Sequence, residues 1–227
     1  MKQYPHIEPY YDSKFIGEYC YAFDKIDGSS FRSEWDRRTS KKSNFGFKKF
    51  GTRTQMITKS NHPFALAADI FMDKYADDLD KIFTEDKFFR GVNKITVFGE
   101  YYGENSFAGL HNPSDEKDVK IFDILVERKG FVKPNDFIDI FGHLDIPTLV
   151  YQGVLTQEFI DKVRNNEFDL MEGVVCKGVR QTKGNEVVWL LKIKSQKWLD
   201  RVKEKYGEKR LLEEFDGKIP IFTSKVL

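Results

Sequence analysis

The sequence predicts a mixed α+β fold with antiparallel sheets flanked by helices. Strand-like runs and helical repeats follow one another irregularly, whereas a doubly wound parallel sheet would alternate them. With 40% hydrophobic and 15% aromatic residues, the chain has ample material for a packed core. Nothing divides this apolar content into halves, so we expect one domain over residues 1–227, of which 195–227 form a C-terminal helix and tail.

In the first half of the chain, aromatic and apolar runs predict three strands and a long helix. The strands are expected at residues 15–23, 31–35 and 45–50, and a basic polar segment at 37–44 separates the last two. From residue 64 to 83, apolar side chains recur at three- and four-residue steps, which predicts a helix with one buried face.

The second half predicts further strands, each close to a turn or a helix start. Strands are expected at 95–102 and 119–126, with an exposed loop at 103–118, and again at 149–154, 174–177 and 187–194. A short helix is expected at 137–141. Thr156 should cap a helix through Val163, and Ser195 should cap a final helix that reaches Tyr206.

The bulk composition excludes several classes of protein. Lys and Arg total 37 against 36 for Asp and Glu, so any basic surface for nucleic acid must be local. Cys20 and Cys176 are too few for a disulfide framework and lack the spacing of a zinc site. The first residues do not resemble a signal peptide, and no stretch is apolar enough to span a bilayer, so we expect a cytoplasmic protein with no membrane partner.

Two short segments place amines where a phosphate can be bound. Lys25-Ile26-Asp27-Gly28-Ser29 follows a predicted strand and puts a lysine beside a glycine turn, although such a lysine is by itself usually a solvated one. Lys192 and Lys194 fall on the same side of their strand. Like charges side by side are costly unless the face meets water or an anion, and a phosphate would relieve the repulsion.

The ordered motifs of the chain resemble those of the covalent nucleotidyltransferase superfamily, which includes DNA ligases, RNA ligases and mRNA capping enzymes. Lys25 to Ser29 is similar to motif I, Phe98-Gly99-Glu100 to motif III, residues 121–124 to motif IIIa, Glu172 to Lys177 to motif IV, and Lys192-Ile193-Lys194 to motif V. The resemblance implies a nucleotidyltransferase (adenylyltransferase) fold.

Finer features are most similar to the RNA ligases that seal nicks in duplexes. These features are Ser29-Ser30-Phe31, Gly51-Thr52-Arg53 and the Phe-Gly-Glu form of motif III. Arg32 does not have the spacing typical of capping enzymes and DNA ligases. Members of this RNA ligase branch commonly have a C-terminal domain, whereas residues 195–227 can supply a helix and a tail, so we expect a minimal form for which a partner protein could replace that domain.

The resemblance implies a role for each motif residue. Lys25 would attack the α-phosphorus of ATP after losing its proton, which needs nearby positive charge because the reference pKa of lysine is about 10.4. Lys192 and Lys194 would neutralise the phosphate, and Glu172 would hold Mg²⁺ or Mn²⁺ unless it is only an edge-strand carboxylate paired with Lys177. The expected nucleotide-binding set is Asp24, Lys25, Asp27, Gly28, Arg53, Glu100, Phe122, Glu172, Val174, Lys177, Lys192 and Lys194.

Within this set, Glu100 and Arg53 would contact the ribose or an RNA 5′-phosphate, and Phe122 would stack on adenine. A Phe at this position in an apolar strand is otherwise most often part of the core. Basic side chains on both sides of the motifs are candidate contacts to RNA phosphates: Arg37, Arg38, Lys41, Lys42, Lys48, Lys49, Lys197, Arg201, Lys203 and Lys205.

The resemblance therefore implies an ATP-dependent RNA ligase for RNA repair. It would join 3′-hydroxyl and 5′-phosphate ends, in a nicked duplex or at paired ends, through a lysyl-AMP intermediate and an adenylylated 5′ end. A DNA ligase would share every motif, and a nucleotidyltransferase acting on another acceptor would share the first transfer. A non-catalytic nucleic-acid-binding module is disfavoured by the intact Lys25, Glu172, Lys192 and Lys194.

Overall fold

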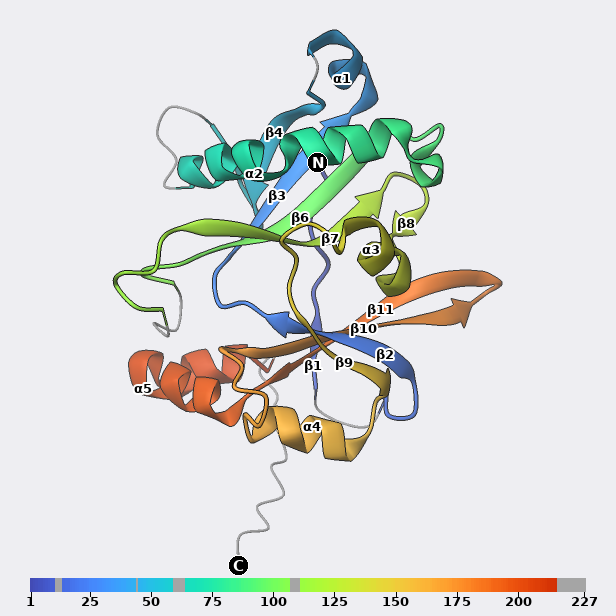
Figure 1. Cartoon of the computed structure of the whole chain (residues 1–227). Coiled ribbons are helices and arrows are strands. Elements are labelled where there is room, and N and C mark those ends of the chain that lie inside the picture. The colour runs from blue at the N-terminus through green and yellow to red at the C-terminus, as the bar shows by residue number, and fades with distance from the viewer. Residues whose placement is uncertain (11–13, 44, 59–63, 107–110, 216–227) are drawn as a thin grey trace, which may run out of the picture. The chain divides into compact units, whose positions relative to one another are not determined.

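The computed structural model describes residues 1–10, 14–43, 45–58, 64–106 and 111–215 (Figure 1). Contacts within the chain group it into two units. Unit 1 contains Met1–Pro5, Asp27–Pro147 and Gln181–Val188, and unit 2 contains His6–Ile26, Thr148–Arg180 and the described residues from Trp189 onward. Each unit takes segments from several parts of the sequence, so no single cut separates them. The expected single domain stays a prediction.

Unit 1 is built on a six-stranded sheet with the order β5-β4-β3-β6-β7-β8. Each pair of neighbouring strands in this sheet is antiparallel, as predicted. The strands are β3 (Ser29–Asp36), β4 (Phe47–Thr52), β5 (Met56–Ile57), β6 (Lys94–Tyr102), β7 (Asp118–Val126) and β8 (Gly130–Phe131).

One face of this sheet packs against the long helix α2 (Ala65–Glu85), which crosses the strands in Figure 1. The rings of Phe31 in β3 and Phe71 in α2 lie 5.4 Å apart, and those of Trp35 and Phe83 lie 5.5 Å apart. The helix predicted at residues 64–83 is confirmed. Shorter helices complete the unit: α1 (Arg37–Ser43), η1 (Lys87–Phe89) and α3 (Pro134–Phe141).

The first residues of the chain lie against the opposite face of the same sheet. Arg32 Nη1 donates to the carbonyl oxygen of Lys2 at 2.8 Å, and the Tyr4 hydroxyl donates to Asp123 Oδ2 at 2.5 Å. The Tyr4 ring also meets the rings of Phe98 and Phe122 at 4.9 and 5.1 Å. This face therefore combines polar and aromatic side chains, in contrast to the apolar face under α2.

Unit 2 is built on a five-stranded sheet with the order β1-β11-β10-β2-β9. β2 pairs antiparallel with β10 and β9, while the short β1 pairs parallel with β11. The strands are β1 (Glu8–Pro9), β2 (Tyr19–Lys25), β9 (Leu149–Val154), β10 (Gly173–Thr182) and β11 (Asn185–Lys194). The end of β10 and the start of β11, within Gln181–Val188, are grouped with unit 1.

One face of this second sheet forms the core of unit 2 with helix α4 (Gln157–Arg164). Cys20 and Ala22 of β2, Val174 and Cys176 of β10, and alternate residues of β11 pack there with Phe159, Ile160 and Val163 of α4. The opposite face consequently carries the other alternate residues of the same strands. Helix α5 (Gln196–Glu213) follows β11 directly and buries Trp198, Leu199 and Val202.

Most predicted elements are confirmed, and the differences have local causes. The strand expected at 15–23 begins at Tyr19 and ends at Lys25, because Lys14 to Glu18 form a turn with Gly17 at a φ of 90°. The basic polar segment 37–44, for which the sequence predicted neither a helix nor a strand, contains the helix α1. The final helix extends beyond Tyr206 to Glu213, and the tail predicted after it lies outside the described residues at 216–227.

Caps at both predicted positions are confirmed. Thr156 accepts a hydrogen bond from the Phe159 amide at 3.2 Å, and Ser195 accepts one from the Trp198 amide at 3.3 Å. Ser195 directly follows Lys194, so the second cap fixes where motif V ends and α5 begins. No helix among the described residues is long and apolar enough to cross a membrane.

Candidate active site

Lys25 is the last residue of β2, where the strand runs beside the start of β10. Its Cα partner across the ladder is Gly173, and Glu172 immediately precedes that glycine. Gly173 has a φ of 149°, and a Cβ atom there would lie 2.1 Å from the carbonyl oxygen of Ile193. The glycine is therefore required for β10 to pass close to β11 at the point where Glu172 meets Lys25.

Glu172 joins the motif I lysine to the second lysine of motif V. Its Oε2 lies 2.8 Å from Lys25 Nζ, and its Oε1 lies 2.8 Å from Lys194 Nζ. Burial opposes ionisation of Glu172, which is 3% exposed, but the ammonium groups of Lys194 and Lys25 outweigh it and lower its pKa. Glu172 is therefore an ionised carboxylate that forms an ion pair with both lysines.

Lys194 is enclosed on further sides by helix α5. Its Nζ lies 2.6 Å from Oε2 of Glu214 and 3.8 Å from the centroid of the Trp198 ring. The Lys194 side chain is only 6% exposed. An ammonium group buried to this degree needs such partners, since desolvation without them would be prohibitive.

The other lysines of the predicted set share the face of the sheet opposite the core of unit 2. Ile193 of β11 packs in that core, so Lys192 and Lys194 alternate onto the opposite face, as predicted. Lys177 of β10 lies there too, with its Nζ 5.0 Å from the centroid of the Phe23 ring. Four lysines, Lys25, Lys177, Lys192 and Lys194, therefore occupy one face of the unit 2 sheet.

Two residues of the predicted set, Asp24 and Val174, lie in unit 2 but outside the lysine cluster. Val174 is fully buried in the hydrophobic core of unit 2, so only its backbone is placed to meet a nucleotide. Its ladder partner is Asp24, which is half-buried at the end of β2. Neither residue belongs to the lysine cluster.

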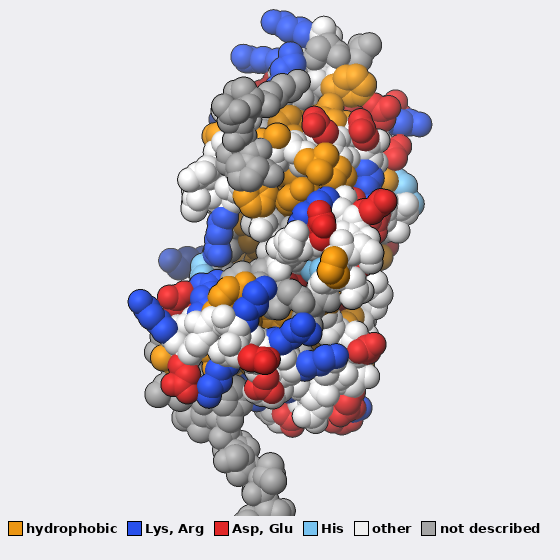
Figure 2. Space-filling model, turned by 90° about the vertical axis from the view of Figure 1, so that its left-hand side faces the viewer, with side chains coloured by type: hydrophobic (Ala, Val, Ile, Leu, Met, Phe, Trp, Pro, Cys, Tyr) orange, Lys and Arg blue, Asp and Glu red, His pale blue; other side chains and the backbone are white. Residues whose placement is uncertain are grey.

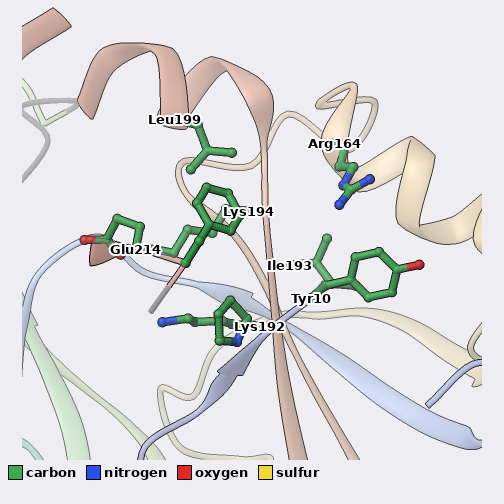
Figure 3. A pocket seen from close by; sticks show the side chains of 9 residues that line it. Tyr10, Arg164, Lys192, Ile193, Lys194, Leu199 and Glu214 are labelled. Carbon is green, nitrogen blue, oxygen red and sulfur yellow. Dashed lines mark hydrogen bonds and ion pairs between the residues drawn. The ribbon is translucent and has the colours of Figure 1, made fainter. Parts of the chain in front are cut away.

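Figure 3 shows a small pocket of unit 2 next to this cluster. Strand β11 contributes Lys192, Ile193 and Lys194 to its wall, and α5 contributes Leu199. Pro9, Tyr10, Arg164, Glu214 and Phe215 complete the wall. Both lysines of motif V thus meet a concave surface.

Unit 1 holds the remaining predicted residues. Asp27 is buried, and its carbonyl oxygen lies 2.8 Å from Nε2 of His111. A Cβ atom at Gly28 would lie 2.5 Å from the carbonyl oxygen of Tyr101, so this turn of motif I needs its glycine. Arg53 is exposed in the bend between β4 and β5.

Glu100 and Phe122 lie on the face of the unit 1 sheet that meets the first residues of the chain. Phe98 pairs with Asp123 and Gly99 pairs with Ile121, so the register skips Phe122 and β7 bulges there. Phe122 is consequently half-buried beside Tyr4 instead of packing under α2, and it is not a core residue. Its predicted contact with adenine stays a prediction.

Sequence reasoning missed three side chains of these clusters. Burial raises the pKa of the Tyr4 hydroxyl, and so do Asp123, to which it donates, and Glu100. Tyr4 precedes every motif, and nothing in its sequence context indicates this contact. Glu214 follows Lys194 by twenty residues. Trp198 follows it by four, but Lys194 ends a strand and Trp198 lies in the next helix, so no periodic spacing indicates either contact.

Comparisons with known proteins identify the relatives of this chain. Solved structures of the RNA ligase of Naegleria gruberi match it over 85% of its length: the enzyme with pyrophosphate at 16% identity and a TM-score of 0.58, and a lysine variant with AMP and Mn at 13% identity and a TM-score of 0.59. A further lysine variant, with ATP and Mn, matches at 14% identity and a TM-score of 0.58.

These matches establish that the fold of the chain is that of a nucleotidyltransferase-type ligase. The chain covers 53% to 54% of each Naegleria chain, so it spans about half the length of the ligase that it resembles. No curated protein gave a significant sequence match. A sequence model described as RNA ligase matches residues 18–194, which contain all five motifs. The chain therefore belongs to the RNA ligase family.

Proposed function

We propose that this protein is an ATP-dependent RNA ligase that carries AMP on Lys25 and joins a 3′-hydroxyl to a 5′-phosphate. The observation that carries the proposal is the cluster in which Lys25 Nζ and Lys194 Nζ share the buried carboxylate of Glu172. Membership of the RNA ligase family supports it, as do the Naegleria structures that contain ATP or AMP together with Mn.

The carboxylate of Glu172 is a suitable ligand for a divalent cation. It is ionised, and carboxylate oxygen is the donor that Mg²⁺ and Mn²⁺ prefer. The described residues contain no cluster of three His, Cys, Asp or Glu side chains suited to a metal, and Mg²⁺ commonly binds through one or two carboxylates, water and substrate phosphates. Glu172 would hold the cation, which when bound would supply positive charge to offset the negative charge of the phosphates.

In the first transfer Lys25 must leave Glu172 and lose a proton to solvent. Its nitrogen then forms a bond to the α-phosphorus of ATP, while the bond from that phosphorus to the bridging oxygen breaks and pyrophosphate leaves with the electron pair. Lys192 and Lys194, on the same face as Lys25, neutralise the negative charge that develops on the phosphate.

The next two transfers reuse the same phosphate-binding face. An oxygen of the RNA 5′-phosphate attacks the AMP phosphorus and the nitrogen–phosphorus bond breaks. The Lys25 nitrogen leaves with the electron pair and takes a proton from solvent, which restores its amine. The 3′-hydroxyl oxygen then attacks the activated 5′-phosphate and AMP leaves, its proton passing to solvent. All three steps require charge neutralisation and in-line placement, which explains why one lysine cluster suffices for them.

We infer that the RNA is a nicked duplex or a pair of aligned ends, bound partly through exposed cations. Lys197 and Arg201 on α5 and Arg38 and Lys41 on α1 are exposed. Arg37 is different, because its guanidinium donates to the carbonyl oxygens of Val92, Phe83 and Phe89 at 2.6 to 3.1 Å. We therefore withdraw Arg37 from the phosphate contacts and retain the exposed residues.

The direct test is covalent labelling of the protein by ATP with a radioactive α-phosphate. Wild-type protein incubated with this ATP and Mg²⁺ or Mn²⁺ is expected to carry a label that survives denaturing electrophoresis, and Lys25→Ala is expected to carry none. Lys14→Ala is the matched control, because Lys14 is an exposed lysine of unit 2 that pairs with Glu8 instead of Glu172. A label that persists in Lys25→Ala would contradict the proposal.

Strand joining separates the competing functions. Labelled protein is chased with nicked duplexes that differ only in having RNA or DNA on the 3′-hydroxyl side of the nick. Sealing of the RNA substrate supports the proposal, and preferential sealing of the DNA substrate would identify a DNA ligase. Labelling of Lys25 without any sealing would point to transfer to another acceptor.

A further inference from the structure

Glu214 is a carboxylate in direct contact with Lys194, one of the proposed phosphate-binding lysines, and the proposed mechanism gives it no role. It stands at the end of α5, and its Oε2 lies 2.6 Å from Lys194 Nζ. Figure 3 shows Glu214 and Lys194 in the wall of the same pocket, although they come from different elements. The Glu214 side chain is 11% exposed, so solvent screens this contact weakly.

The contact completes a row of alternating charges that begins at the nucleophile. Lys25 pairs with Glu172, Glu172 with Lys194, and Lys194 with Glu214. At the far end Glu214 Oε1 lies 3.1 Å from Nη2 of Arg210 in the preceding helical turn. Lys194 therefore faces two carboxylates and the ring of Trp198, which together occupy the directions in which its ammonium can donate.

The backbone of α5 is bent in a way that carries Glu214 to this position. Gly207 interrupts the helix with φ 81° and ψ 175°, a conformation that is essentially restricted to glycine. In the described part of the chain, no atom lies within 4 Å of the place where a Cβ would stand at Gly207, so space is not the reason for this glycine. The glycine is needed for the bend itself. After the bend, α5 ends with Glu214 as its C-cap, and the next residue, Phe215, is buried.

We propose that Glu214 is an affinity-determining residue of the phosphate site, an internal counter-ion that a polyphosphate must displace from Lys194. A phosphate oxygen and the Glu214 carboxylate are both anions, and both need the same ammonium group. If Glu214 remains in place it repels the phosphate, and if it moves the chain loses a buried ion pair, so either way it lowers the affinity. The inference rests on the proposed function only for naming the ligand as the triphosphate of ATP, for which inorganic pyrophosphate serves as the probe.

The test is calorimetric binding of inorganic pyrophosphate at constant ionic strength. Glu214→Gln keeps the shape and a hydrogen bond to Lys194 but removes the charge, so its dissociation constant is expected to be at least about fivefold lower than that of wild type. Glu213→Gln is the matched control, because the neighbouring Glu213 is exposed and lies 2.6 Å from Arg210 Nη1. Its dissociation constant is expected to stay within about twofold of wild type.

A second variant approaches the same contact through the backbone. Gly207→Ala changes no charge, but alanine disfavours the bend that brings Glu214 to Lys194, so pyrophosphate binding should also tighten. This variant decides the matter if Glu214→Gln loses its helical circular dichroism. Unchanged or weaker pyrophosphate binding by a folded Glu214→Gln, or by Gly207→Ala in its absence, overturns the inference.

The binding measurement is independent of the covalent reaction. If wild-type protein binds pyrophosphate but takes no label from ATP, the proposed ligase activity is refuted. The role of Glu214 is then still decided by pyrophosphate binding to the variants. Wild-type protein that takes the label, together with a Glu214→Gln variant that binds no more tightly, would refute only the role of Glu214.

Discussion

Glu172 is the residue on which the lysine cluster depends. It is the counter-ion of both Lys25 and Lys194, and two of these three charged groups have side chains exposed by 6% or less. A buried ion pair adds little stability compared with an apolar pair, but removing one partner leaves the others uncompensated. The carboxylate is therefore structural in the ligand-free protein, in addition to its proposed role toward a cation.

This view makes Glu172→Gln strongly destabilising. The free energy of unfolding is expected to fall by about 3 kcal/mol, because two ammonium groups lose their shared counter-ion. Urea denaturation at neutral pH measures the change. Glu158→Gln provides the comparison: Glu158 pairs with Lys162 on the surface of α4, where solvent screens the pair, so its loss should change the free energy of unfolding far less than Glu172→Gln does. Equal effects of the two substitutions would contradict the assigned role of Glu172.

At the scale of elements, ion pairs tie three segments of unit 1 together. Lys74 of α2 lies 2.6 Å from both Asp118 of β7 and Asp145, which follows α3, and Lys120 of β7 lies 3.0 Å from Asp145. Burial opposes ionisation of Asp145, but hydrogen bonds from Lys74 and Lys120 outweigh it and lower its pKa. The ionised form of Asp145 thus holds these segments to one another.

The lowered pKa fixes the pH range in which this network contributes. Unfolded Asp has a pKa of about 3.9, so the stabilisation by Asp145 is fully present above that value and is lost as the pH falls through the lower folded-state pKa. We expect the difference in unfolding free energy between wild type and Asp145→Asn to be constant from neutral pH to about pH 5 and to shrink below about pH 4. Urea unfolding across this range measures it, and a difference that grows on acidification would contradict the network.

The elements that the sequence predicted well are those whose own pattern decides their structure. The helix at 64–83 has a periodic apolar face that packs under the sheet, and Thr156 and Ser195 cap helices through local hydrogen bonds. Helix α1 lacks an apolar face. It is held instead by Asp36, which caps it, by Ser40, which donates to Asp80 of α2, and by Arg37. Such distant partners are not visible in a local pattern.

The same distinction applies to the candidate site. The motifs placed Lys25, Glu172 and Lys194 in the right elements, but the strand register that brings Lys25 opposite Gly173 depends on pairing across 148 residues. The bulge at Phe122 arises from the β6–β7 pairing, and the contact of Glu214 arises from a bend at a glycine in α5. Each of these depends on tertiary structure, which explains why a single sequence did not predict them.

At the scale of the whole molecule, the balance of charge constrains how RNA can bind. The formal net charge is +1, so there is no strong overall attraction to a polyanion and affinity must come from local contacts. Figure 2 shows the consequence on one face of the molecule, where Lys and Arg side chains lie interspersed with Asp and Glu. The affinity for RNA should therefore fall at high salt concentration and when individual Lys or Arg side chains are removed.

The salt dependence of RNA binding tests this arrangement. Affinity for a nicked RNA duplex is expected to fall as salt rises, with a slope of log affinity against log salt of roughly −0.9 for each phosphate neutralised. Lys197 and Arg201 stand one helical turn apart on the exposed side of α5, just after motif V. The double substitution to Ala should make the slope shallower by about 1 to 2 units if both side chains meet phosphates.

Lys162→Ala in α4, which removes an exposed cation already paired with Glu158, should leave the slope unchanged. Fluorescence anisotropy over a salt series measures the affinity of wild type and both variants. The slope reports the number of counterions released on binding and does not depend on the absolute affinity. An unchanged slope in the double variant would therefore show that α5 is not part of the RNA-binding surface.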